Sequence, residues 1–271
     1  MVGTIRVGIG GWTYEPWRGT FFPDKWPHAK ELDYAASKLT AIEVNGTYYS
    51  SQKPATFAKW GKAVPDGFKF ALKASRYCTN RKVLAEAGES IARFCGQGIV
   101  ELGDRLGPIL WQFMATKKFA ADDFEAFLKL LPGSRDGVPL DHVVDVRHES
   151  FACPEFVALA RAAGVAICHT DSADYPAIGD ATGPLRYARL MRTVEAEATG
   201  YATDAIANWV NVARGWAEGR GDDLFPKADE TPGKDMPRDA YLFYISGAKV
   251  RAPQAAMATI ERLTASSFPR S

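Results

Sequence analysis

Short apolar runs alternate with helical patterns along most of the chain, and this alternation limits the folds that it can adopt. Eight runs predict strands, at 5–9, 41–44, 68–72, 108–112, 142–146, 165–168, 185–190 and 240–245. Helical patterns fall at about 29–39, 54–63, 82–102, 122–131, 154–163, 203–218 and 253–263. Strands that alternate with helices favour a parallel sheet with right-handed crossovers.

The length of the chain favours closure of that sheet. With 271 residues, each strand–helix unit takes about 34 residues, which is the size of a unit in a (β/α)₈ barrel. We therefore predict an α/β fold, a TIM-barrel-like (β/α)₈ domain over residues 1–271, with a doubly wound open sheet as the main alternative.

Two segments depart from the regular alternation. The residues between Cys168 and Leu185 show no helical periodicity, so the sixth helix is predicted to be missing or reduced to a turn. The polar stretch 219–239 is rich in proline and glycine and lies between a helix and a strand. In a barrel, this position predicts a surface loop on the bottom face.

Polar or aromatic side chains stand at the carboxyl ends of seven predicted strands. They are Trp12 and Tyr14; Glu43 and Asn45; Lys73 and Arg76; Gln112; Asp145, Arg147 and His148; His169 and Asp171; and Arg189. A closed barrel brings all of these ends to one face, and barrel enzymes carry their active sites on that face. An open sheet would spread them along an edge.

Glu43 and Asp145 are the candidate catalytic residues. They belong to the second and fifth strands, which lie almost opposite each other in an eight-stranded barrel, so the two carboxylates could flank a substrate. Paired carboxylates in different environments serve as general acid and base. The alternative is that each forms an ion pair with a neighbour such as Lys73 or Arg147.

The basic residues at the same ends predict an anionic substrate. Lys73, Arg76, Arg147 and Arg189 outnumber the carboxylates Glu43, Asp145 and Asp171, and arginine binds phosphate or carboxylate through two parallel hydrogen bonds. Internal neutralisation by these carboxylates is the alternative. The other predicted substrate-binding residues are Asn45, Gln112, His148 and Asp171.

The glycines of "VGIGGWTYEPWRG" do not form a dinucleotide-binding loop. Pro16 and bulky rings stand where a helix would have to open onto a pyrophosphate. Trp12, Tyr14 and Trp17 could instead stack on a base or a sugar at the barrel mouth. Alternatively, they close the top of the barrel or fix the loop.

Composition argues against several other classes. The net charge of +1 gives no overall attraction to nucleic acid or membrane, and the four cysteines form no CxxC pair. The four histidines form neither HxH nor HExxH, so we expect no metal and no cofactor. We find neither a signal-peptide pattern nor a membrane-spanning apolar run, which favours a cytoplasmic protein.

Five segments carry a resemblance to a known family. "GWTYEPWRGTFFP", "EVNGTYY", "FKFALKASR", "LGPILWQF" and "DVRHESF" resemble, in this order, the signatures of the YecE-like domain of unknown function, family 72. The resemblance implies a TIM-barrel-like fold and brings no established activity. This chain departs from the family pattern at Asp145, where glutamate is usual, at Met191 and Arg192 in place of His-Gly, and at Ser246 and Gly247 in place of asparagines.

The leading functional hypothesis is a metal-independent enzyme that uses acid–base chemistry on a phosphorylated or otherwise anionic substrate, of hydrolase or lyase type. The alternatives are a metal-assisted phosphodiesterase or nuclease, and a non-catalytic binder of nucleic acid or a metabolite. The sequence leaves the substrate, the reaction and the oligomeric state open.

Overall fold

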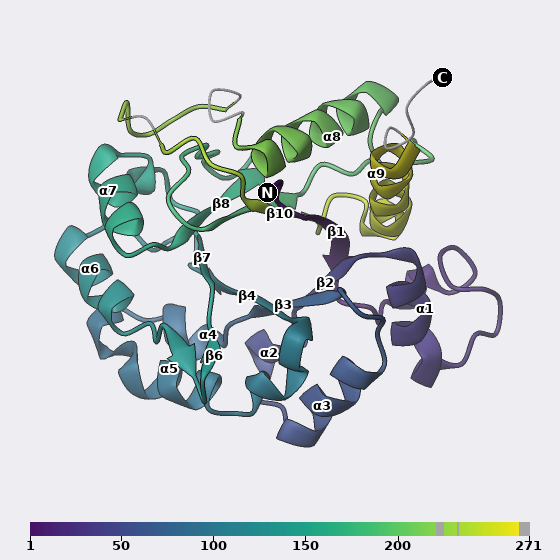
Figure 1. Ribbon diagram of the computed structural model, residues 1–271, viewed down its shortest axis with the longest axis horizontal. Helices are drawn as coiled ribbons and strands as arrows, with labels where there is room; N and C mark the ends of the chain where they lie inside the picture. The colour runs from purple at the N-terminus through teal and green to yellow at the C-terminus, as the bar shows by residue number, and fades with distance from the viewer. Residues whose placement is uncertain (221–224, 232, 266–271) are drawn as a thin grey trace.

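The strands of this chain close into a barrel. The computed structural model describes residues 1–220, 225–231 and 233–265 (Figure 1). Neighbouring strands are parallel, in the order β1-β10-β9-β8-β7-β4-β3-β2 around the barrel. Their bounds are β1 (Ile5–Gly10), β2 (Ala41–Val44), β3 (Lys69–Lys73), β4 (Leu106–Gln112), β7 (His142–Asp145), β8 (Ala166–Asp171), β9 (Leu185–Leu190) and β10 (Asp239–Tyr244). The prediction of a barrel is confirmed, and the open sheet is excluded.

Helices surround the barrel (Figure 1). The longer ones are α1 (Glu31–Lys38), α3 (Pro54–Lys62), α5 (Gly88–Cys95), α6 (Ala121–Lys129), α7 (Pro154–Ala162), α8 (Thr203–Glu218) and α9 (Ala252–Ala265). The short helices α2 (Gly46–Tyr49) and α4 (Arg76–Thr79) and the antiparallel pair β5 (Ser134–Arg135) and β6 (Val138–Pro139) were not predicted. Among the described helices, none is long and apolar enough to cross a membrane.

The predicted helix 82–102 is broken into three pieces. A 3₁₀ turn, η3 (Leu84–Ala87), precedes α5, and a second irregular 3₁₀ segment, η4 (Ile99–Arg105), follows it. Gly98 separates α5 from η4 with a φ of 103°, and a Cβ at this position would lie 2.7 Å from Pro54. The close approach of α3 therefore requires glycine and ends the helical run.

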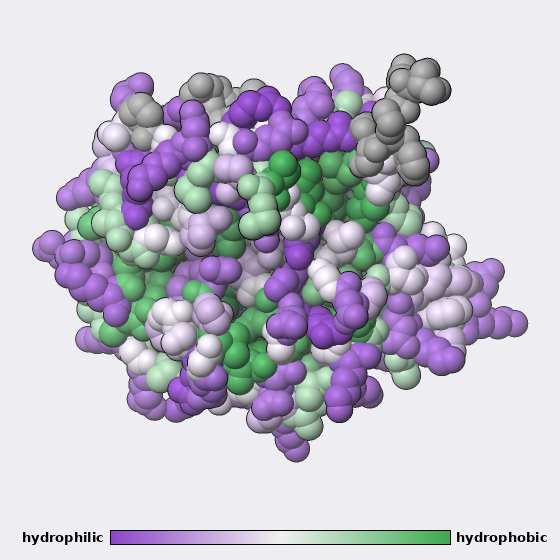
Figure 2. Space-filling view, viewed as in Figure 1, coloured by the Kyte–Doolittle hydropathy of each residue, from purple (hydrophilic) through white to green (hydrophobic). Residues whose placement is uncertain are grey.

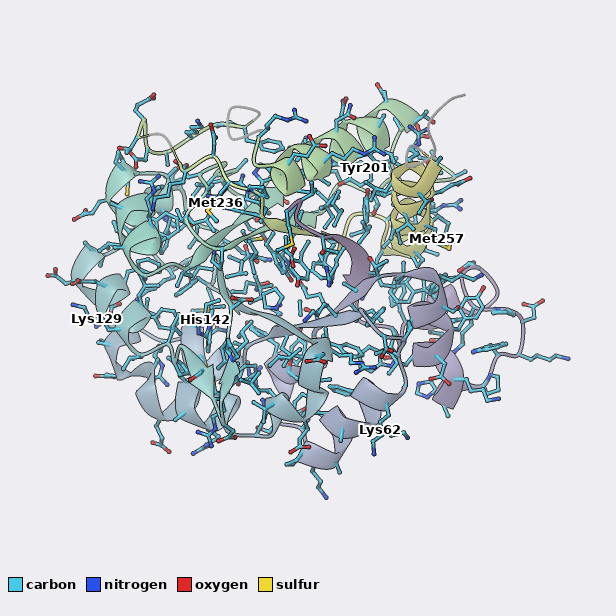
Figure 3. The ribbon with its side chains drawn as sticks, in the orientation of Figure 1. Lys62, Lys129, His142, Tyr201, Met236 and Met257 are labelled. Carbon is cyan, nitrogen blue, oxygen red and sulfur yellow. The ribbon has the colours of Figure 1, made fainter. Side chains whose placement is uncertain are left out.

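Side chains fill the space inside the strands (Figure 3). The inner layer includes the buried rings of Tyr187, Tyr241 and Phe243. β1 contributes Gly8 here, where a Cβ would lie 1.9 Å from the Ala41 carbonyl oxygen and 3.2 Å from the Phe243 ring. A larger, separate apolar layer packs between the strands and the helices. On the face shown in Figure 2, hydrophilic side chains are interrupted by hydrophobic patches.

The sixth helix is missing, as predicted: residues 172–184, between β8 and β9, contain no helix. Residues after α8 cover the outer face of β8 instead. The Phe225 ring lies 3.9 Å from the ring of His169 on β8, centroid to centroid, and 5.6 Å from that of Trp209 on α8. The Asp180 carboxylate accepts hydrogen bonds from the backbone N–H groups of Ala228 and Asp229, at 2.8 and 3.2 Å.

This arrangement corrects the expected position of the stretch 219–239. Its residues 225–229 pack against the outside of β8 and the segment that follows it, and are not confined to the bottom face. The physical reason is that the missing helix leaves apolar surface on β8 that another segment must cover. Residues 221–224 and 232 of the same stretch lie outside the described residues.

Candidate functional site

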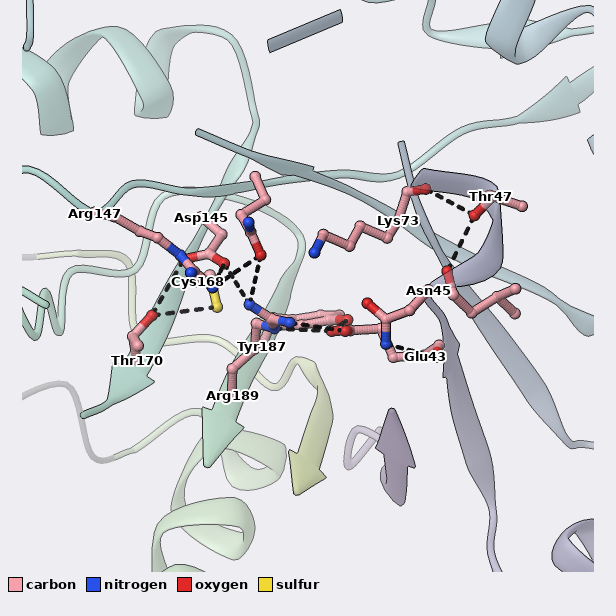
Figure 4. A network of polar contacts seen from close by, with 12 residues as sticks. Glu43, Asn45, Thr47, Lys73, Asp145, Arg147, Cys168, Thr170, Tyr187 and Arg189 are labelled. Carbon is pink, nitrogen blue, oxygen red and sulfur yellow. Dashed lines mark hydrogen bonds and ion pairs between the residues drawn. The ribbon is translucent and has the colours of Figure 1, made fainter. Parts of the chain in front are cut away.

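A fully buried arginine organises the carboxyl-terminal end of the barrel. Arg189, on β9, donates from Nε and Nη2 to the two carboxylate oxygens of Glu43 on β2, each at 3.1 Å. Its Nη1 donates to Oδ2 of Asp145 on β7, at 2.7 Å, and to Oε1 of Gln112 on β4, at 3.0 Å. One guanidinium therefore joins four strands (Figure 4).

Glu43 and Asp145 have no exposed surface. Glu43 Oε2 also accepts a 2.7 Å hydrogen bond from the hydroxyl of Tyr187, and Asp145 Oδ1 accepts one from Thr170 at 3.4 Å. Burial lowers the pKa of Arg189, but the charges of Glu43 and Asp145 outweigh burial and raise this pKa above its ordinary value. Each buried charge of this cluster has a bonded partner of opposite sign, so the loss of one partner would be strongly destabilising.

The carboxylates of Glu43 and Asp145 therefore lie across the barrel from each other, as the sequence predicted. They are bonded to Arg189 and do not face an open pocket. Neither lines the cavity described next. The contacts of both carboxylates are the ion pairs that were predicted as the alternative to catalysis. Acid–base catalysis by either residue stays a prediction.

A cavity of about 680 Å³ opens above this cluster. Five of the predicted substrate-binding residues line it: Asn45, Lys73, Gln112, Arg147 and Arg189. The other lining side chains were not predicted to bind substrate; they are Tyr48, Tyr49, Ser172, Asp174, Tyr175, Met191, Ile245, Ser246 and Lys249. Two of these, Ser246 and Met191, are positions where the chain departs from the family pattern, and Gly247, a third departure, also lines the cavity.

Arg147 forms one wall of the cavity. Its Nη2 donates to Gln112 Oε1 at 2.8 Å and lies 3.3 Å from Asp145 Oδ2, so a carboxylate holds this arginine. Its guanidinium stacks on the ring of Tyr175 at 4.4 Å. The Arg147 Nε is buried and has no hydrogen-bond partner in the part of the chain that the structure describes.

Two lysines bring further positive charge to the cavity. The Nζ of Lys73, at the end of β3, lies 4.2 Å from the ring centroid of Tyr48. Burial, followed by the charge of Arg189, lowers the pKa of Lys73 to about 8. The Nζ of Lys249, after β10, lies 4.7 Å from the Tyr14 ring, and burial lowers the pKa of Lys249 as well.

The aromatic residues of the first loop do not line the cavity. Trp12 packs edge-on against Trp60, with ring centroids 5.1 Å apart, and Trp17 is buried. Tyr14 packs edge-on against Trp17 at 5.2 Å, and the Trp17 Nε1 donates to the Lys249 carbonyl at 3.0 Å. These contacts agree with the alternative that the rings fix the loop. Trp12 also lines a separate pocket, and a ligand contact by the three rings stays a prediction.

Other predicted residues lie outside the cavity. Arg76 is exposed and its guanidinium lies over the Tyr77 ring. The His148 Nδ1 hydrogen bonds with Ser150, and Asp171 forms an ion pair with Arg192. Arg76 and His148 come after their strands and Asp171 is the last residue of β8, but none of the three lines the cavity.

The histidines are not part of a metal-binding cluster in the described part of the chain. The described residues contain no group of three or more His, Cys, Asp or Glu side chains placed to hold a metal ion. His169 lies on the outer face of β8, and burial lowers its pKa to about 4. The expectation of no bound metal stays a prediction.

Comparisons with known proteins agree with the fold. The family model described as "Protein of unknown function DUF72" matches residues 6–267. A DUF72 family protein of Thermotoga maritima has a solved structure with a TM-score of 0.70 and 20% identity, over 96% of this chain and 99% of that one. One from Enterococcus faecalis gives a TM-score of 0.68 and 17% identity, over 97% and 98%. No curated protein matches. The two solved structures share the barrel fold of this chain. The chain therefore belongs to the DUF72 family.

Proposed function

We propose that this protein binds a small phosphorylated or carboxylated molecule in the 680 Å³ cavity and acts on it by metal-independent acid–base chemistry. The observation that carries the proposal is the charge of the lining. The negative charges of Glu43 and Asp145 balance the positive charges of Arg189 and Arg147. The two ammonium groups of Lys73 and Lys249 then face one carboxylate among the lining residues, that of Asp174.

An anion would relieve the cost of this arrangement. A half-buried or buried ammonium without a carboxylate partner is poorly solvated, and the lowered pKa values of Lys73 and Lys249 reflect it. Arg147 adds a guanidinium whose donors are partly unused, and guanidinium groups match carboxylate and phosphate oxygens in pairs. The ligand oxygens would satisfy all three groups at once.

The acid–base part of the proposal falls on Lys73. A pKa of about 8 lets this side chain hold or release a proton near neutral pH, which suits a general acid or base. Glu43 and Asp145, predicted for this role, would instead hold Arg189 in place. Proton transfer of this kind serves the hydrolase and lyase classes expected from the sequence.

A thermal-shift screen tests the anion site. Inorganic phosphate, sulfate and phosphorylated metabolites are added to the protein, and a ligand at one hundred times its Kd stabilises by about 2.7 kcal/mol. We expect Arg147→Ala to abolish the shift and Arg147→Lys to weaken it, because a point charge does not replace the two-pronged contact. Arg76→Ala is the matched control, since Arg76 is exposed outside the cavity.

The same screen separates the alternatives. If both Arg147 variants bind as tightly as the parent, Arg147 is structural and the anion site is wrong. Stabilisation that needs added Mn²⁺ or Zn²⁺ would favour the metal-assisted phosphodiesterase. Stabilisation by oligonucleotides alone would favour the nucleic-acid binder.

A further inference from the structure

We propose that the Lys73 amine is a nucleophile that forms an imine with the carbonyl carbon of an anionic aldehyde or ketone held in the cavity. This inference rests on the proposed anion site and goes beyond it, because it assigns a covalent step and a substrate class. The experiments below are chosen so that either can fail alone.

The position of Lys73 differs from that of Lys117 and Lys129, whose amines are held by carboxylates. The Nζ of Lys117 lies 2.8 Å from an Asp123 oxygen, and the Nζ of Lys129 lies 2.8 Å from a Glu125 oxygen. Lys73 is buried, with only 7% of its surface exposed. Its Nζ nevertheless has no hydrogen bond or ion pair within the described residues. A structural lysine at this depth would be expected to have a carboxylate partner.

The surroundings of Lys73 hold the amine at the cavity and leave it free to react. The side chain extends from the end of β3 toward the Arg189 cluster (Figure 4). The ring of Tyr48 supports the Nζ from one side at 4.2 Å, and the Tyr48 hydroxyl is itself held by Asn80 at 3.0 Å. Lys73, Tyr48 and Arg189 all line the same cavity, so a ligand bound there can reach the Lys73 amine.

The charged groups that face Lys73 come from three other strands and the loop after one of them. Burial and the cation Arg189 on β9 favour the neutral amine, and Arg147 after β7 adds to this. Glu43 on β2 and Asp145 on β7 oppose it, but both are bonded to Arg189. The net effect lowers the pKa of Lys73 to about 8.

The lowered pKa of Lys73 increases the fraction of its amine that is neutral and therefore reactive. At pH 7 roughly a tenth of such an amine is neutral, against about three in ten thousand for a lysine with the ordinary pKa. The neutral amine is the nucleophile, and an adjacent cation or burial is the means by which enzymes activate such lysines.

The step balances without another reactant. The Lys73 nitrogen pair forms a C–N bond to the carbonyl carbon, and the C=O π pair moves to the oxygen, which takes up a proton from solvent. The nitrogen of the resulting adduct then gives one of its protons to the hydroxyl, which leaves as water, and the nitrogen pair completes the C=N bond. One neutral amine, one carbonyl and one proton from solvent give one protonated imine and one water, with no change in oxidation state. Arg147 and Lys249 would hold the carboxylate or phosphate of the same molecule.

Reductive trapping tests the covalent step. The protein is incubated with glyoxylate or with glyceraldehyde 3-phosphate and sodium cyanoborohydride, and modified peptides are quantified by mass spectrometry. We expect the Lys73 peptide to be modified at least tenfold faster than the peptide of Lys129, which lies on the exterior and is paired with Glu125. Modification of Lys73 no faster than Lys129 with both probes would overturn the inference.

Phosphate competition separates this inference from the anion site. Inorganic phosphate should slow trapping at Lys73 and leave Lys129 unchanged. Phosphate stabilisation without an adduct on Lys73 would overturn the imine and keep the anion site. Fast trapping that phosphate does not slow would keep the nucleophile and overturn the anion site.

Two further measurements need no substrate turnover. Labelling by trinitrobenzenesulfonate across pH should give Lys73 a midpoint near 8, and a midpoint equal to that of Lys129 would count against the inference. Lys73→Arg removes the primary amine, so it should lose the trapped adduct, whereas Arg76→Ala, outside the cavity, should keep it. An undiminished adduct in the Lys73→Arg variant would overturn the assignment to Lys73.

Discussion

Arg189 shows how a single buried charge fixes the end of the barrel. Its guanidinium is paired with Glu43 and Asp145, and removing it leaves Glu43 buried without its ion-pair partner and Asp145 paired with Arg147 alone. We expect Arg189→Met to destabilise the protein by about 3–5 kcal/mol in urea unfolding, the range for a broken buried pair. The triple variant that adds Glu43→Gln and Asp145→Asn should regain part of this loss. A triple variant less stable than Arg189→Met would contradict the pairing argument.

Lys73 is the opposite case, a charge that the fold does not compensate. Its pKa is about 8 in the folded protein and 10.5 ordinarily, so the folded state binds fewer protons than the unfolded state between these values. Stability therefore rises with pH across this window. We expect Lys73→Met to be more stable than the parent at pH 7, with the difference shrinking toward pH 10.

Urea unfolding at pH 7 and pH 10 checks this expectation. Lys129→Met is the matched control, because Lys129 is exposed and should show no such pH-dependent gain. A Lys73→Met protein that is less stable than the parent by the same amount at both pH values would show that the amine is a structural support.

At the residue scale, the sequence indicates which side chains reach the barrel end but not how they pair. Glu43, Lys73, Gln112 and Arg189 follow apolar runs, and strand-end position alone brings them together. The same rule also selected Arg76, which the short helix α4 turns outward. The pairing of Arg189 with two carboxylates depends on distances across the barrel, which a local pattern does not contain.

At the scale of elements, the replacement of the sixth helix makes a specific prediction. Phe225 is partly exposed and lies against His169, whose pKa burial lowers to about 4. We expect Phe225→Ala to cost roughly 1–3 kcal/mol, less than the loss of a fully buried phenylalanine. It should also admit water to His169 and raise its pKa toward 6.5.

The lowered pKa of His169 determines how the stability of the protein changes with pH. In the parent, the folded state binds fewer protons than the unfolded state between pH 4 and 6.5, so stability falls as pH drops through this window. Phe225→Ala should reduce this dependence, and an NMR titration of His169 measures its cause directly. Met236→Ala, at an exposed position of the same segment, is the control. An unchanged His169 titration in Phe225→Ala would show that Phe225 does not shield the ring.

The elements were largely predictable because strands and helices have different hydrophobic periods. The missing sixth helix was visible as a lack of periodicity. Two features of the elements could not be predicted from the sequence. The break near Gly98 depends on the close approach of Pro54, and the covering of β8 by Phe225 joins segments more than fifty residues apart. Both are consequences of tertiary packing, which local sequence does not report.

At the scale of the whole molecule, near-neutral charge coexists with a locally positive cavity. The net charge is +1, so the protein has little long-range attraction for a polyanion. The positive groups that face the cavity, Lys73, Lys249 and Arg147, are partly or largely withdrawn from solvent. Salt screens such groups less than exposed ones. This contrast favours one small anion over a nucleic acid backbone.

The salt dependence of binding tests this contrast. One phosphate in the cavity engages few charges, so its Kd should rise only about as much as the salt concentration when sodium chloride increases from 50 to 200 mM. A protein that contacts six to ten phosphates of a nucleic acid loses about 10³–10⁵ in affinity over the same range. Isothermal titration with inorganic phosphate and with a ten-residue oligothymidylate measures both slopes. Tight oligothymidylate binding with the steep slope would mean that surface lysines and arginines outside the cavity dominate, and the small-anion proposal would be wrong.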